Sequence, residues 1–142
     1  MKLYRGQKII PKYHLPLLIG ICFLLAELIP ATLLAAPDVT ARYVQSGGTR
    51  LVIEINAGAN PPASAILVQH LPSGVRILTS QPEAEQYNAN RNSAKWLLRN
   101  LRAGVSTVSI TLDRAVSGGD ISAEIRFKSA QSGKMATIQV EK

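Results

Sequence analysis

From Val39 to the C-terminus, apolar side chains recur at every second residue, and this alternation limits what the chain can form. Leu51, Ile53 and Ile55, for example, would share one face of a strand, opposite a mostly polar set. A period of two is that of a β-strand with one buried and one solvated face, whereas a helix needs a period near 3.6. The region therefore predicts strands and no helix.

Turn-forming residues divide this region into about eight short strands at a spacing of roughly 8–15 residues. The paired glycines at 47–48 and 118–119 supply the backbone freedom that tight hairpins need. Leu71 to Gly74 suits a type I turn, with Pro72 at its second position. The segment Gln81–Asn92 is polar and rich in Asn, so it is predicted to be the longest loop. Together these signals predict an all-β fold, an antiparallel sandwich of two sheets.

Residues 1–36 differ from the rest and are predicted to be a separate leader. Four basic residues and no acid precede an apolar stretch from Leu15 to Ala36. A basic start, an apolar centre and small residues after it are typical of a secretory signal peptide. Cleavage after Ala35, Ala36 or Ala41 stays open. The folded domain is then predicted to be 37–142.

A signal anchor is the alternative for the same leader, since about 20 apolar residues suffice to span a bilayer as a helix. Glu27 and Pro30 count against it, because an acidic residue in the membrane is costly and proline interrupts a helix. Both alternatives place the domain outside the cytoplasm, since the basic flank stays inside. We expect a periplasmic, cell-surface or extracellular protein, in contact with a membrane only through residues 15–36 if the leader is kept.

The cysteine content indicates what stabilises the domain, and the charge distribution limits the classes of partner that it binds. The only cysteine, Cys22, lies in the leader, so the domain has no disulfide and depends on its core. Beyond residue 37 there are twelve basic and eight acidic residues, scattered along the sequence. A nucleic-acid site needs clustered basic residues with interleaved aromatics, so no nucleic-acid partner is predicted.

Few residues in the domain are suited to catalysis or to holding a cofactor. His70 is the only histidine outside the leader, and no His, Cys or carboxylate group has the spacing of a metal site. A triad of His70, Asp113 and a serine can be imagined, but nothing resembles the turn that presents a nucleophilic serine. We therefore predict no cofactor, no metal and no enzymatic activity.

The aromatic residues offer two candidate binding features. Trp96 shares its strand face with Ala94 and Leu98, which favours the core over a sugar-stacking platform. Tyr87 lies in the polar loop, and loops at the ends of a sandwich commonly carry binding residues. The sequence predicts a binding surface made of Tyr87, Asn88, Asn90 and Arg91.

The middle of the domain resembles a known family. Leu71, Pro72, Gly74 and Val75, then Trp96, then Asn100, Leu101 and Gly104, are similar to the pattern of the conserved-repeat, immunoglobulin-like domains of bacterial and archaeal surface proteins. The resemblance implies an immunoglobulin-like antiparallel β-sandwich of about 7–8 strands, used as a stalk, spacer or adhesive module. Family members usually occur in tandem, whereas this chain has one copy.

Two functions follow as hypotheses. The first is a non-catalytic structural or adhesive module of the cell envelope or extracellular space, which binds another envelope or extracellular protein through edge strands or loops. The second is a carbohydrate-binding module, which requires Trp96 or Tyr87 on an exposed flat or grooved face.

Overall fold

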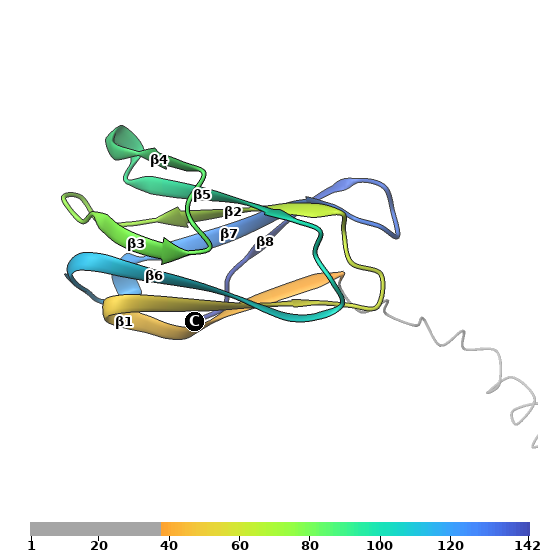
Figure 1. The fold of residues 1–142 in the computed structure, drawn as a ribbon, viewed down its shortest axis with the longest axis horizontal. Coiled ribbons are helices and arrows are strands. Elements are labelled where there is room, and N and C mark those ends of the chain that lie inside the picture. Colours follow the sequence, from red (N-terminus) through yellow and green to blue (C-terminus); the bar gives the residue numbers. More distant parts are fainter. Residues whose placement is uncertain (1–37) are drawn as a thin grey trace, which may run out of the picture. The chain divides into compact units, whose positions relative to one another are not determined.

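A computed structural model describes residues 38–142, and the predicted leader with Cys22 lies outside them. The described residues contain eight strands and no α-helix, so the all-β prediction is confirmed. The strands form two antiparallel sheets, with the orders β1-β6-β3 and β4-β5-β2-β7-β8 (Figure 1). Their bounds are β1 Val39–Ala57, β2 Ser64–His70, β3 Ile77–Gln81, β4 Gln86–Asn88, β5 Ser93–Arg99, β6 Gly104–Val116, β7 Ser122–Lys128 and β8 Met135–Gln139, with the 3-10 turns η2 Ala89–Arg91 and η3 Gly118–Asp120.

Strand β1 doubles back on itself. Fully extended, its 19 residues would span roughly 60 Å. Instead, the amide of Gly58 donates to the carbonyl oxygen of Asp38 at 2.9 Å, and Arg42 forms an ion pair with Glu54 at 2.8 Å. The two halves therefore lie side by side, and the reversal at Gly48, which has a φ of 79°, matches the predicted turn (Figure 1).

The two sheets are joined along one side and open along the other. The amide of Tyr43 donates to Glu141 at 2.7 Å, and the amide of Glu141 donates to Ala41 at 2.9 Å. The chain that follows β8 thus leaves its own sheet and pairs with the first half of β1. On the opposite side, β3 and β4 are the last strands of their sheets, and this open side exposes their edges.

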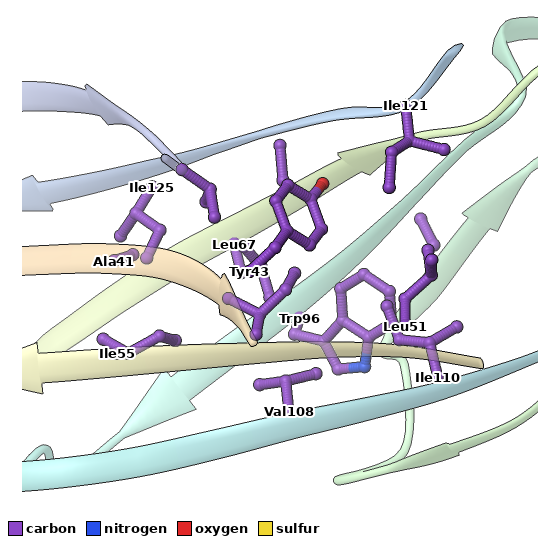
Figure 2. Packing of buried hydrophobic residues seen from close by; sticks show 14 of the residues in the cluster. Ala41, Tyr43, Leu51, Ile55, Leu67, Trp96, Val108, Ile110, Ile121 and Ile125 are labelled. Atoms are coloured by element: carbon purple, nitrogen blue, oxygen red, sulfur yellow. The ribbon is translucent and has the colours of Figure 1, made fainter. Parts of the chain in front are cut away.

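The core lies between the sheets and consists of the residues that the alternation assigns to one face. Leu51, Ile53, Leu67, Ile110 and Ile125 are each completely buried. Burial of such a side chain contributes about 1.5–3 kcal/mol, which allows a domain without disulfides to be stable. Figure 2 shows the Trp96 indole within this cluster.

Two local predictions were wrong. The turn that follows β2 is closed by the amide of Val75 and the carbonyl of Pro72, one residue later than the predicted Leu71–Gly74 turn. The reason is Gly74, whose φ of 78° places a left-handed residue in the third position of that turn. The predicted loop Gln81–Asn92 also contains secondary structure, since β4 pairs with β5 within it.

Candidate functional site

The four residues of the predicted binding surface lie in β4 and η2. Asn88 caps η2, because its side-chain oxygen accepts a hydrogen bond from the amide of Arg91 at 3.1 Å. Asn92 ends η2 in the left-handed conformation, with a φ of 46°. Asn is among the residues that tolerate this conformation, so the Asn-rich sequence specifies a compact turn. Asn90 is exposed within that turn.

Strand geometry divides this predicted surface in two. Tyr87 and Asn88 are successive residues of β4, and successive side chains of a strand point to opposite faces. Tyr87 lines a pocket beside β3, whereas Asn88 and Arg91 line a different pocket on the outer face of the five-stranded sheet. The structure therefore brings Asn88 and Arg91 together and places Tyr87 at a separate site.

The pocket beside β3, here named the edge pocket, lies on the open side of the sandwich. Its volume is about 470 Å³, within the usual range of ligand pockets. Leu78 is 63% exposed and Tyr87 is 41% exposed, so two large apolar side chains are accessible to solvent in this pocket. The lining residues are Ile77, Leu78, Thr79, Ser80, Gln81, Glu83, Ala84 and Tyr87.

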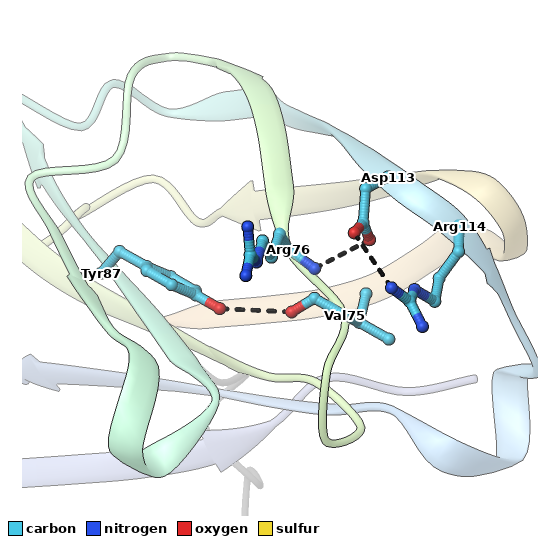
Figure 3. Close-up of polar contacts among 5 residues, drawn as sticks. All are labelled: Val75, Arg76, Tyr87, Asp113 and Arg114. Atoms are coloured by element: carbon cyan, nitrogen blue, oxygen red, sulfur yellow. Dashed lines mark hydrogen bonds and ion pairs between the residues drawn. The ribbon is translucent and has the colours of Figure 1, made fainter.

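Hydrogen bonds fix both ends of the chain segment that leads into β3 (Figure 3). The Tyr87 hydroxyl donates to the carbonyl oxygen of Val75 at 3.2 Å. The amide of Arg76 donates to Oδ1 of Asp113 at 2.9 Å, and the amide of Asp113 donates back to the Arg76 carbonyl at 3.0 Å. The bond from Arg76, aided by nearby Arg114, holds the pKa of Asp113 below its ordinary value. The start of the edge strand is thus held in place on two sides.

Trp96 positions the far end of the same strand from inside the core. Its side chain is 1% exposed, which confirms the core prediction and leaves no face for sugar stacking. The indole nitrogen donates to the carbonyl oxygen of Pro82 at 3.1 Å and to Oγ of Ser80 at 3.3 Å. The amide of Ala84 also donates to Ser80 Oγ, at 3.1 Å. Trp96 therefore anchors the connection between β3 and β4.

A second pocket, here named the sheet-face pocket, lies on the outer surface of the five-stranded sheet. Its volume is about 320 Å³. Ile66 and Val68 of β2 form an aliphatic part of the lining, and polar or charged side chains surround them. These are His70, Gln86, Asn88, Arg91, Ser93, Lys95, Glu124 and Arg126. Basic residues that are scattered in the sequence meet on this face.

The residues considered for catalysis are not brought together. His70 lies on β2 of the five-stranded sheet, whereas Asp113 lies on β6 of the three-stranded sheet. The Asp113 carboxylate accepts a hydrogen bond from the Arg76 amide and forms an ion pair with Arg114. Within residues 38–142, no three His, Cys, Asp or Glu side chains are grouped as metal ligands. The same part of the chain holds no helix with the length and apolarity to cross a bilayer.

Comparisons of this chain with models of protein families, with curated proteins and with solved structures find no match.

Proposed function

We propose that this protein is an exported protein-interaction module in which the free edge of β3 pairs with an extended segment of another protein. The observation that carries the proposal is the position of β3, which pairs with β6 on one side and has the edge pocket beside its other side. Addition of a strand to such an edge is a common mode of peptide recognition, in which main-chain hydrogen bonds give affinity and pockets give specificity.

The composition of β3 supports this role. Natural sheets protect exposed edges with lysine, proline, bulges or very short strands. Strand β3, from Ile77 to Gln81, contains neither a charge nor a proline, although a register shift between Ile77 and Thr79 limits regular pairing to its second half. By contrast, β4, the other edge of the open side, has only three residues. We therefore assign the docking edge to β3, with Leu78 and Tyr87 as the apolar contacts.

An immunoglobulin-like domain of bacterial or archaeal surface proteins is the fold class that we propose for this module. The positions of the residues that carry the resemblance support this proposal. Gly74 lies in the turn after β2, Trp96 is buried in β5, and Asn100 and Gly104, with φ of 54° and 107°, surround the turn into β6. The family implies a structural or adhesive task, which agrees with recognition through a strand edge.

Site-specific crosslinking in the producing cells tests the proposed function. A photoreactive amino acid at Thr79, whose side chain is exposed on β3, should crosslink to a discrete partner protein. Leu78→Lys should abolish the crosslink, because a charge at an edge opposes strand addition. Val105→Lys is the matched control, since Val105 is 62% exposed but lies on β6. A crosslink that survives Leu78→Lys, or that both variants abolish, would overturn the proposal.

A further inference from the structure

The outer face of the five-stranded sheet carries a concentration of positive charge. On this side, η2, β5 and β7 present five cations: Arg91, Lys95, Arg99, Arg126 and Lys128. Within residues 38–142 only two carboxylates, those of Glu85 and Glu124, accompany them. The whole described part of the chain has an excess of four basic residues. Most of that excess therefore belongs to one face.

Three of these cations have no acidic partner within residues 38–142. Arg99 pairs with Glu85 at 3.4 Å, and Arg126 pairs with its strand neighbour Glu124. Arg91, Lys95 and Lys128 form no ion pair inside the described domain. Of these, Arg91 and Lys95 line the sheet-face pocket. Their charges are available to an anion that enters the pocket.

The register of the strands places aliphatic surface between the cations. Lys95 of β5 lies opposite Val68 of β2, and Ile66 of β2 lies opposite Arg126 of β7. Neighbouring strands are about 4.8 Å apart, so the backbones of β5 and β7 are separated by roughly 10 Å across β2. A flat ring lying over Ile66 and Val68 would have Lys95 on the β5 side. On the β7 side it would have Arg126 together with its ion-pair partner Glu124, which lies opposite Val68.

From this arrangement we propose that the sheet-face pocket binds an acidic polysaccharide, a sugar polymer that carries carboxylate or sulfate groups. The aliphatic side chains of Ile66 and Val68 receive the apolar face of a sugar ring. Arg91 and Lys95 neutralise its acidic groups through charge-assisted hydrogen bonds.

Hydrogen-bonding groups, and the absence of Phe, Tyr and Trp from the described lining, favour a sugar over a nucleic acid. The amide of Gln86, the hydroxyl of Ser93 and the imidazole of His70 surround the pocket and match the hydroxyl groups of a sugar. Binding of single-stranded nucleic acid commonly uses aromatic side chains on which the bases stack. Among the described residues that line this pocket there is no Phe, Tyr or Trp.

Binding of the full-length chain to defined polymers tests the inference. Polygalacturonate carries carboxylates, dextran sulfate carries sulfates, and neutral dextran is the uncharged control; retardation in affinity electrophoresis at about 0.15 M salt measures affinity. We expect retardation by at least one acidic polymer and none by neutral dextran. The acidic polymer that retards the chain more strongly identifies the preferred group.

Charge-matched variants separate a specific site from general attraction. Arg91→Gln with Lys95→Gln should weaken binding roughly tenfold or more, because both charge-assisted contacts are lost. Arg50→Gln with Arg102→Gln removes the same charge from exposed positions outside the pocket and should change binding less than roughly twofold. Since all four side chains lie at the surface, equal melting temperatures of the two double variants would exclude unfolding as the cause.

Three outcomes would overturn the inference: no retardation by either acidic polymer, equal losses in both double variants, or tighter binding of single-stranded DNA than of both acidic polymers. The edge-pocket variant Leu78→Lys should leave polymer binding unchanged, since Leu78 does not line the sheet-face pocket. Failure of the polysaccharide site and failure of the strand-edge proposal are therefore distinguishable.

Discussion

The hydroxyl group of Tyr43 donates a 2.7 Å hydrogen bond to Oε1 of Gln69 inside the core. Tyr43 belongs to β1 and Gln69 to β2, so this bond joins the two sheets. The Gln69 amide nitrogen donates to the carbonyl oxygens of His70 at 2.8 Å and Ser122 at 3.1 Å. Both the oxygen and the nitrogen of the fully buried Gln69 amide thus have hydrogen-bond partners, which offset the cost of removing the amide from water.

This pair makes stability depend on pH at the alkaline end. Burial raises the pKa of Tyr43 to about 12, although the bond to Gln69 opposes part of the rise. Between about pH 10 and 12 the folded state keeps a proton that the unfolded state releases, so the free energy of unfolding should fall as pH rises. Tyr43→Phe should show a shallower fall over this range in urea unfolding. Equal slopes for the two proteins would contradict the prediction.

At neutral pH the same substitution should be destabilising. Tyr43→Phe leaves Oε1 of Gln69 without its donor in the core, which costs about 1–3 kcal/mol. Urea unfolding at pH 7 measures this loss. Tyr87→Phe is the control, because the hydroxyl that it removes belongs to a side chain at the surface. A loss no larger than that of the control would argue against the buried bond.

Gly118 is predicted to be the glycine that least tolerates a side chain. A Cβ atom there would lie 2.9 Å from Oγ of Ser46 and 3.0 Å from the Ser46 carbonyl oxygen. Gly118→Ala should therefore push the β6–η3 connection away from the turn of β1 and destabilise the protein by about 1–3 kcal/mol. Gly119→Ala is the matched control, since its nearest contact is 3.7 Å away. Equal melting temperatures for the two variants would contradict this account.

Alternation in the sequence was sufficient to predict most of the strands and most of the core. Leu51, Ile53 and Ile55 are buried as their period of two requires, and Trp96 lies in the core with them. The strand within Gln81–Asn92 could not be predicted, because β4 is only three residues long and its side chains show no alternation. Its position is set by pairing with β5, a tertiary interaction.

The candidate sites were harder to predict than the fold. Period-two parity could have shown that Tyr87 and Asn88 face opposite ways once β4 was known to be a strand. Prediction of the basic face of the five-stranded sheet requires the strand order as well, because Lys95 and Arg126 lie on either side of β2 only through the order β5-β2-β7. Sequence order gives no direct measure of which strands are neighbours, so charges that are scattered in the sequence converge in the fold.

Trp96 provides a direct optical measure of the core. It is the only tryptophan, and its side chain is 1% exposed. The indole nitrogen donates a hydrogen bond to the carbonyl oxygen of Pro82. We expect blue-shifted fluorescence emission, little quenching by iodide, and a red shift on unfolding that coincides with the loss of the circular dichroism signal. Emission typical of an indole in water in the native protein would place Trp96 at the surface and overturn the packing described here.

The hydrogen bond that Asp113 accepts from the Arg76 amide, just before β3, should depend on pH in the acid range. Its pKa is lowered first by the hydrogen bond from the Arg76 amide and then by the nearby Arg114 charge. The carboxylate therefore stabilises the fold above its ordinary pKa, near 3.8, and this contribution is lost as pH falls below that value. An NMR titration should show the Arg76 amide shift following Asp113 ionisation, with a midpoint below 3.8. In Asp113→Asn the side-chain oxygen can still accept the bond, so the amide should remain protected from exchange but lose its titration; an unchanged titration would assign it to another group.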